Sequence, residues 1–383
     1  MKILHLLGSL DQRSGGPLRA VLDLSAHAQD LGLHSEVLGF GALDIPDNPL
    51  APALIHALPF SGPPSYGYSS ATRAWCRGNL SRFDGVILHG MWSHADWILS
   101  RECLRAGIPY ICFPHGMLDA WSVHEQGAWK RAKKILYWHW RERKVFARAA
   151  AAFFTTRREL ENARETFRLP EIHPWIVIPY GVAPLAGPRA EPSSNVAQRA
   201  DTKVALFLGR LHPGKRADLL IRAWKAAELP PEWRLVIAGS GRQECTKYLQ
   251  ELARACGISD VVQFTGAVAG EDKRYLLQRA QWFLLPSEHE NFGIALLEAI
   301  IAGCAVAVSD QVYLSDALPA GSEILPVNLE AWTAFLRTRM VDDTWHDALV
   351  RRTIRQIAEA YGLDAITRGW VSTIQTVLRG CAG

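Results

Sequence analysis

Short apolar segments alternate with longer amphipathic ones along most of the chain. The apolar segments predict strands over residues 2–7, 33–40, 85–89, 110–113, 152–155, 177–179, 203–208, 234–238, 262–265, 282–285 and 305–308. Several of them lead through a polar or Gly-containing loop into a segment with helical periodicity. This repeated order of strand, loop and helix is typical of α/β proteins.

The length of the chain and one stretch of linker composition divide this pattern into two domains. At 383 residues the chain is too long for one ordinary core. Residues 184–201, PLAGPRAEPSSNVAQRAD, have the composition of a linker. Residues 41–70, rich in Pro, Gly and Ser, predict a surface loop. We therefore predict an N-terminal domain over residues 1–185, a linker over 186–201, a C-terminal domain over 202–362 and a final helical segment over 363–383.

The segment over residues 286–310, PSEHENFGIALLEAIIAGCAVAVSD, has the most unusual pattern in the chain. It predicts a helix that begins near Asn291 or Phe292 and is apolar on every side, as in a buried helix. Glu298 lies inside this helix, where a carboxylate is costly unless it has a partner, and Glu290 lies just before it. Because free N–H groups and the helix dipole attract anions, the segment predicts a phosphate site flanked by two carboxylates. Its length suits a diphosphate with a sugar on one side and a ribose on the other.

Loops that follow other predicted strands carry further candidate residues. Arg210 and Lys215 follow strand 203–208, where two cations can hold a diphosphate. His89 and His115 each begin a His-Gly pair at a strand end, which marks the edge of a cleft in an open parallel sheet. For each of these side chains taken alone, a packing or surface role is the commoner outcome.

Residues 126–148, QGAWKRAKKILYWHWRERKVFAR, are basic and rich in Trp and Tyr at helical spacing. One interpretation is a solvated amphipathic helix whose aromatic residues pack on the sheet. The other is a helix that lies on a membrane surface, since basic residues and Trp suit anionic headgroups. The second would bring the protein to a lipid-linked acceptor.

Composition and charge narrow the class of protein. The net charge of +4 does not require a nucleic-acid partner, and we predict none. The seven cysteines are odd in number and form no C-x-x-C pair, which favours a reduced cytoplasmic protein over a disulfide framework or zinc site. The N-terminus begins directly with a strand, MKILHLLG, and no apolar run is long enough to span a bilayer, so we expect no signal peptide or transmembrane helix.

The combination of Glu290-x7-Glu298, the string GRLHPGK, the string PHGML and the pair Gly15–Gly16 resembles retaining glycosyltransferases of family 4, which are of the GT-B type. The resemblance implies two Rossmann-like α/β domains facing a central cleft, with the C-terminal helix crossing back to the N-terminal domain. It also implies a hexosyltransferase that takes its sugar from a UDP- or GDP-sugar without a metal or other cofactor. PHGML is similar to a subgroup from surface-polysaccharide pathways, and the implied acceptor is a glycan or lipid-linked acceptor.

The resemblance also implies roles for individual residues. Glu290 and His115 would contact the donor sugar, while Arg210 and Lys215 would neutralise the diphosphate. The implied donor-binding positions are Gly16, Gly239, Val268, Asn291, Phe292, Gly293, Ile294 and Glu298, with Glu298 on the ribose and Val268 on the base. Acceptor contacts are assigned more loosely, to His89, Trp92 and Asp119. Tyr180, in IPYGV, and Arg216, after Lys215, depart from the family pattern, which has Asn and Gly there.

The favoured reaction is front-face transfer with retention, in which the leaving phosphate oxygen takes the acceptor proton; Glu290 as a covalent nucleophile is the alternative mechanism. Two other functions remain open: a nucleotide-sugar epimerase or phosphorolytic enzyme of the same fold, and a catalytically silent partner subunit. The expected location is the cytoplasm, at the inner face of the membrane if the basic aromatic helix binds lipid.

Overall fold

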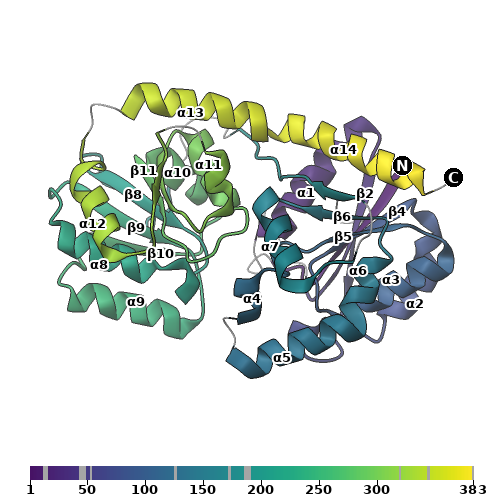
Figure 1. Cartoon of the computed structure of the whole chain (residues 1–383). Helices are drawn as coiled ribbons and strands as arrows, with labels where there is room; N and C mark the ends of the chain where they lie inside the picture. The colour runs from purple at the N-terminus through teal and green to yellow at the C-terminus, as the bar shows by residue number, and fades with distance from the viewer. Residues whose placement is uncertain are drawn as a thin grey trace. The chain divides into compact units, whose positions relative to one another are not determined.

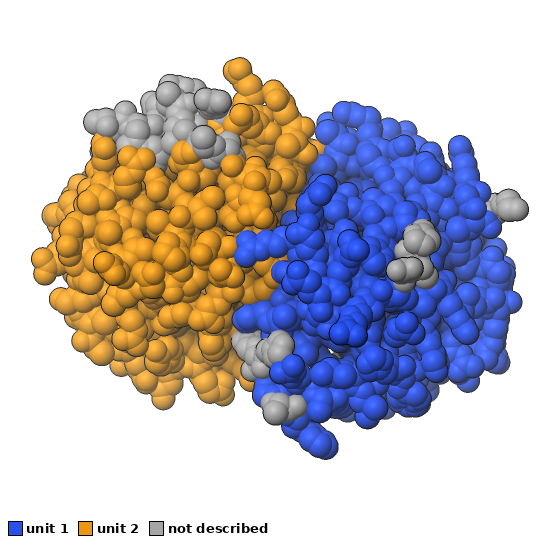
Figure 2. Space-filling view, in the orientation of Figure 1, with its two compact units in different colours: residues 1–181, 363–383 blue, residues 182–362 orange. Residues whose placement is uncertain are grey.

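The computed structural model describes residues 1–11, 16–42, 49–51, 54–124, 127–170, 174–184, 191–318, 321–342 and 346–381. They form two compact units, which Figure 1 labels by element and Figure 2 colours blue and orange. Unit 1 contains residues 1–181 and 363–383, and unit 2 contains residues 182–362.

Unit 1 is built on a seven-stranded sheet in the order β3-β2-β1-β4-β5-β6-β7, in which every pair of neighbours is parallel. The strands are β1 Lys2–Leu7, β2 His34–Phe40, β3 Ile55–Leu58, β4 Gly85–His89, β5 Tyr110–Phe113, β6 Ala151–Phe154 and β7 Trp175–Val177. The central strands β4, β5 and β6 are buried along their whole length, as apolar strands of a parallel sheet covered on both faces must be.

Helices connect these strands and cover the sheet (Figure 1). They are α1 Gly16–Ala28, α2 Thr72–Asn79, α3 His94–Ala106, α4 Ala120–His124, α5 Gly127–Tyr137, α6 Arg143–Ala147, α7 Arg157–Phe167 and α14 Leu363–Gly380, with a π-helical turn, Trp138–Glu142, between α5 and α6. The C-terminal helix α14 packs beside α1, and its Trp370 donates from Nε1 to the Pro179 carbonyl at 2.9 Å. Trp370 and Val371 are buried, as the apolar face of this segment predicts.

Unit 2 repeats the architecture with a six-stranded sheet in the order β10-β9-β8-β11-β12-β13, again parallel throughout. The strands are β8 Lys203–Leu208, β9 Trp233–Ala238, β10 Val262–Gly266, β11 Trp282–Leu285, β12 Ala305–Ser309 and β13 Glu323–Leu325. The helices are α8 Ala217–Ala227, α9 Gln243–Ala255, α10 Gly270–Arg279, α11 Ile294–Ala302, α12 Leu329–Thr338 and α13 His346–Tyr361. In both units the loops that leave the carboxyl ends of the strands lie at one edge of the sheet, where such folds bind ligands.

The predicted α/β class with two parallel-sheet units is confirmed, while some local bounds differ. The predicted loop over residues 41–70 contains strand β3, which pairs with β2. Helix α11 begins at Ile294 instead of Asn291 or Phe292, because Gly293 has the left-handed φ of 77°. The described part of the predicted linker, residues 191–201, packs on unit 2: the Ser193 amide, for example, donates to Asp272 at 2.8 Å. Residues 186–190 of that linker lie outside the described residues.

None of the helices formed by the described residues is both long and apolar enough to span a membrane.

Candidate active site

Two loops at the carboxyl edge of the unit 2 sheet bring the predicted acids and bases together. One follows β8 and carries Arg210 and Lys215, and the other follows the adjacent strand β11 and carries Glu290. The loops are joined through their backbones, since the Glu288 amide donates to the Gly214 carbonyl at 2.8 Å. Residues 75 positions apart in sequence thus become neighbours.

Lys215 and Glu290 form an ion pair at the centre of this edge. Lys215 Nζ lies 2.5 Å from Glu290 Oε2 and donates to the His289 carbonyl at 3.2 Å. The two side chains retain only 16% and 22% of their exposure. Burial would raise the pKa of the Glu290 carboxyl, but the Lys215 ammonium, with smaller contributions from His289 and Arg210, holds that pKa below its ordinary value. Glu290 is therefore ionised at neutral pH.

Glu298 has the partner that its place in an apolar helix requires. Lys273 of α10 lies 2.6 Å from Glu298 Oε1, and both side chains are about one third exposed or less. Nothing in the sequence singles out Lys273, which stands among charged residues in the first turns of α10. Only the packing of α10 against α11 makes it a neighbour of Glu298.

Two glycines allow the loops at the same edge of the sheet to approach one another closely. A Cβ on Gly239, which has φ of 143°, would lie 1.8 Å from the Gly209 carbonyl oxygen, so only glycine fits where the loops after β8 and β9 approach. Gly293 ends the loop before α11 in a left-handed conformation, and the first helical amides follow it. Asn291, Phe292, Ile294 and Val268 all lie on the loops that follow β10 and β11 or at the first turn of α11.

Arg216 occupies the position at which the family pattern has Gly, and the backbone explains why. Its φ of 53° is left-handed, a conformation that glycine adopts most easily. The side chain makes ion pairs with Asp218 at 3.1 Å and with Glu288 at 2.7 Å. The Glu288 contact ties the loop that carries Lys215 to the loop that carries Glu290.

In unit 1 the two His-Gly pairs lie at the ends of adjacent strands, and their rings touch. His89 Nδ1 lies 2.9 Å from His115 Nε2, and His89 Nε2 lies 2.9 Å from Nδ1 of His5, on β1. His5 and His89 are buried, while His115 is half-buried. Burial lowers the pKa of His5 to about 4 and that of His115 to about 3, and it lowers the pKa of His89 as well, so the rings are neutral at pH 7.

The turn after β5 holds His115 in a strained position. His115 has φ of 54°, and the amide of the following Gly116 donates to the buried Glu159 carboxylate at 2.6 Å. Tyr180 stacks beside His115 with its hydroxyl 3.3 Å from Nε2 and 3.4 Å from Nδ1. Tyr180, which departs from the family pattern, thus contacts a candidate site residue directly.

The loosely assigned acceptor residues lie near the same strand ends. Trp92 has φ of 73°, rare for a bulky residue, and donates from Nε1 to the Met117 carbonyl at 3.2 Å. Asp119 is buried and accepts from the Trp121 amide and from Asn162. His89 has both ring nitrogens engaged by other histidines. Gly16 is exposed and is the first residue of α1, while its neighbour Gly15 lies outside the described residues.

Within the described part of the chain, no three His, Cys, Asp or Glu side chains are grouped in a way that could hold a metal ion.

The basic aromatic segment is helical from residue 127, and its large apolar residues divide between two environments. Trp138 is buried against Phe146 and Phe167, as the packing interpretation predicts. Trp129, Leu136 and Trp140 are 83%, 71% and 57% exposed, which the packing interpretation does not predict.

Comparison with known proteins identifies the family of the chain. A family model described as "Glycosyl transferase 4-like domain" matches residues 15–181, and one described as "Glycosyl transferases group 1" matches residues 189–321. An uncharacterized glycosyltransferase of Methanocaldococcus jannaschii is 29% identical over 187 residues, which cover 48% of this chain and 47% of that protein. The D-inositol 3-phosphate glycosyltransferase of Kineococcus radiotolerans is 32% identical over 216 residues, which cover 50% of this chain and 49% of that protein. The chain thus matches about half the length of these relatives.

Among solved structures, Anabaena HepE in complex with UDP and glucose has a TM-score of 0.76, with 17% identity over 98% of this chain and all of that one. At this level of identity the likeness concerns the fold. Together the two family models span most of the sequence, and the chain belongs to the group 1, family 4 glycosyltransferases, with their GT-B fold.

Proposed function

We propose that the protein transfers a sugar from a UDP- or GDP-sugar to a hydroxyl of a glycan or lipid-linked acceptor, with retention of configuration and without a metal. The pathway proposed is the synthesis of a bacterial surface polysaccharide or lipopolysaccharide. The observation that carries the proposal is the Lys215–Glu290 pair beside the first turn of α11, with Arg210 on the same loop as Lys215. The UDP bound to Anabaena HepE supports a nucleotide donor.

The hydrogen-bonding capacity of Lys215 fits a phosphate partner. An ammonium has three N–H groups, and within the described residues Nζ donates to Glu290 and to the His289 carbonyl. The third N–H is left for a phosphate oxygen. Arg210 is exposed on the same loop and supplies a second cation, and the amides at the start of α11 supply neutral donors. A diphosphate leaving group needs this combination, because negative charge grows on it as the bond to the sugar breaks.

The two glutamates then take different parts of the donor. Glu298 uses Oε1 for Lys273, and Oε2 is directed in our proposal to the ribose hydroxyls. Glu290 shares its carboxylate between Lys215 and the hydroxyls of the sugar. Val268 and Gly239 line the base and phosphate side. In unit 1 His115 contacts the sugar, and Trp92 and Asp119 serve the acceptor side.

In the proposed reaction the acceptor hydroxyl attacks the anomeric carbon on the face from which the diphosphate departs. The bond from the anomeric carbon to the phosphate oxygen breaks, and its electron pair stays on that oxygen, which takes the acceptor proton. The products are the glycosylated acceptor and the protonated nucleoside diphosphate. Glu290 stabilises the sugar without forming a covalent bond to it.

The exposed residues of α5 and the π-helical turn support membrane association. Trp129, Leu136 and Trp140 follow one another at spacings of seven and four, which places them on one face of a helix with Lys133. Large apolar side chains beside basic ones suit an anionic lipid surface. We propose that this face rests on the cytoplasmic side of the membrane and brings the site to a lipid-linked acceptor.

A double variant tests the membrane contact. Trp129→Ser with Trp140→Ser should abolish co-sedimentation with anionic liposomes, and Tyr248→Ser, which removes an aromatic residue 49% exposed in unit 2, should leave it unchanged. Equal binding by wild-type and double-variant protein would refute the contact.

Incubation with labelled donors tests the reaction. Thermal-shift screening with UDP-, GDP- and ADP-sugars identifies the donor, because a ligand stabilises the folded state that binds it. NMR of the product should show the anomeric configuration of the donor, and EDTA should leave the rate unchanged. Sugar interconversion without acceptor, or phosphorolysis, would support the epimerase or phosphorylase alternative. Nucleotide binding with neither transfer nor donor hydrolysis would support a silent partner subunit.

A further inference from the structure

Three histidines from three different strands or strand ends of unit 1 form one continuous hydrogen-bonded row: His5, His89 and His115. The two N···N distances are both 2.9 Å. The ring centroids are 5.1 and 5.2 Å apart, and the planes differ by 26° and 7°. In each contact the ring centroids are farther apart than the two nitrogens by about two ring radii. Since the planes are also nearly parallel, the rings meet edge to edge. Each contact is therefore an in-plane hydrogen bond and not a face-to-face stack.

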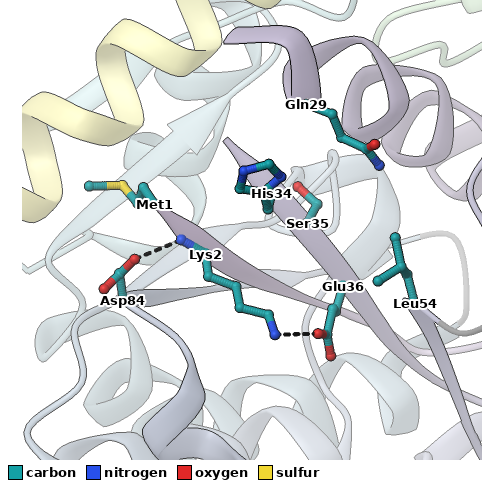
Figure 3. Close-up of a pocket in the computed structure, with 8 residues that line it drawn as sticks. All are labelled: Met1, Lys2, Gln29, His34, Ser35, Glu36, Leu54 and Asp84. Atoms are coloured by element: carbon teal, nitrogen blue, oxygen red, sulfur yellow. Dashed lines mark hydrogen bonds and ion pairs between the residues drawn. The ribbon is translucent and has the colours of Figure 1, made fainter. Parts of the chain in front are cut away.

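The row has one end at a hydroxyl and the other at the candidate site. His5 Nε2 lies 3.3 Å from Ser35 Oγ, and Ser35 lines a cavity of about 460 Å³ together with Lys2, His34, Glu36 and Asp84 (Figure 3). At the other end His115 is half-buried against Phe113 and Tyr180, and the Tyr180 hydroxyl lies 3.4 Å from its Nδ1. The row thus runs from a pocket at the start of β1 and β2 to the carboxyl edge of the sheet.

Counting protons shows that the three rings cannot choose their tautomers independently. A neutral imidazole has one N–H and one bare nitrogen, and each N···N bond needs one of each. If His5 Nδ1 donates to His89, then His89 Nδ1 must donate to His115 Nε2, and the proton of His115 is on Nδ1. In the opposite state every bond reverses, His5 donates to Ser35, and His115 Nδ1 is bare.

We propose that His5 and His89 are positioning residues that hold His115 in the Nδ1–H tautomer, so that this nitrogen, which lies 3.4 Å from the Tyr180 hydroxyl in the free protein, donates a hydrogen bond to a hydroxyl of the donor sugar when the donor binds. Neutral histidine in water favours the Nε2–H form, so the row would reverse the intrinsic preference. Ser35 allows this polarity, because its hydroxyl can donate to the bare Nε2 of His5 as readily as it can accept from it in the reversed row. The sugar contact rests on the proposed function, but the tautomer itself does not.

The energetic reason is the burial of the row. His5 and His89 are 1% and 5% exposed, so a nitrogen of either ring that loses its partner cannot turn to water instead. The left-handed backbone at His115 keeps the third ring in line with the other two. A ring held this way presents one defined proton to a ligand.

Long-range ¹H–¹⁵N spectra of histidine-labelled protein test the proposal, because protonated and bare ring nitrogens have distinct shifts. At pH 7 His115 should show a protonated Nδ1 and a bare Nε2. Single His→Phe variants assign the signals. His89→Phe and His5→Phe should both let His115 return toward the Nε2–H form, although His5 does not touch it. His27→Phe, on the surface end of α1, should change nothing.

The kinetic counterpart distinguishes this proposal from a failure of the proposed function. His5→Phe should lower kcat/KM for the donor roughly tenfold, the value of one hydrogen bond, while the affinity of unit 2 for the free nucleotide stays at the wild-type level. The inference would be overturned, even if the enzyme is active, by an Nε2–H form of His115 in the wild-type protein. It would also be overturned if neither His5→Phe nor His89→Phe changed the tautomer of His115. If no donor is turned over, the spectra still decide the question of the tautomer. Should His5→Phe fail to fold, His89→Phe and the wild-type spectrum suffice.

Discussion

Replacing Lys215 by Met should separate the structural from the catalytic role of the Lys215–Glu290 pair. The substitution keeps the unbranched side chain, one atom shorter, and removes its charge. At the observed 2.5 Å and an effective dielectric constant of about 20, the gross attraction between the two charges is about 7 kcal/mol. Desolvation of the two groups offsets much of it, and removing one partner of a buried pair typically costs about 3–5 kcal/mol. Because both side chains keep some exposure, we expect a loss at the lower end, about 3 kcal/mol, in the stability of unit 2.

The catalytic loss adds to the structural one. If Lys215 neutralises charge that grows on the leaving diphosphate, its removal should lower kcat about 10²–10³-fold, as removal of one transition-state donor does. Lys215→Arg keeps the positive charge but spreads it over a planar guanidinium group. Its kcat should lie between those of the wild-type protein and Lys215→Met. Lys247→Met, which removes an exposed lysine paired with Glu251 on α9, is the matched control and should leave turnover within twofold.

Two measurements decide the outcome. Urea unfolding monitored by unit 2 amide exchange gives the stability, and single-turnover transfer at saturating donor gives the chemical step. A kcat within threefold of wild-type, together with the expected loss of stability, would show that Lys215 only supports the loop, and the assignment of the diphosphate site would then be wrong.

Three further outcomes follow from the same contacts. Glu298→Gln should weaken nucleotide binding about tenfold by calorimetry with little change in kcat at saturation; a large drop in kcat with unchanged affinity would argue against a ribose contact. Arg216→Gly should be more stable to urea than Arg216→Ala, because both lose the ion pairs but only Gly relieves the φ of 53°; the reverse order would refute the strain argument. The pKa values of His5 and His115, about 4 and about 3, lie below the unfolded value of about 6.5, so the folded state binds fewer protons and its stability falls as the pH drops below 6.5. At pH 5 the neutral ring of each histidine should lower the free energy of unfolding by about 2 kcal/mol. Urea titrations at pH 7 and pH 5 should show a smaller pH dependence of stability in His5→Phe than in the wild-type protein. An unchanged pH dependence would contradict the neutral row.

The sequence predicted best where a local pattern and a sheet edge coincide. The strand, the polar loop and the apolar helix over residues 282–302 could be predicted because periodicity and a glycine stop are local signals. The approach of Lys215 to Glu290 follows from the same logic, since both follow strands of one parallel sheet and must emerge at one edge. The start of α11 was misplaced because Asn and Phe are compatible with a helix, and only the left-handed Gly293 delays it.

Partners supplied by tertiary packing left no signal in the sequence. Lys273 is one of several charged residues at the start of α10, and it becomes the partner of Glu298 only when α10 packs on α11. His5 stands inside the apolar strand KILHLL, where a single histidine predicts nothing beyond burial. Its role depends on His89, the last residue of β4, and the order of the strands in the sheet is not encoded by any short motif.

The candidate residues of unit 2 are ion pairs, whereas those of the histidine row in unit 1 are neutral. Each arrangement fits its proposed ligand. In unit 2 Lys215 is paired with Glu290 and Lys273 with Glu298, each with capacity left for another partner. Charges that are already paired and oriented need little rearrangement when a diphosphate and its counter-charges arrive. Unit 1 buries its titratable rings neutral, because a sugar hydroxyl needs a directed dipole and gains little from a net charge that burial would make costly. A cation in the histidine row would instead be expected only if the ligand there were itself an anion, so the neutral rings favour the sugar, and not the diphosphate, as the ligand of His115.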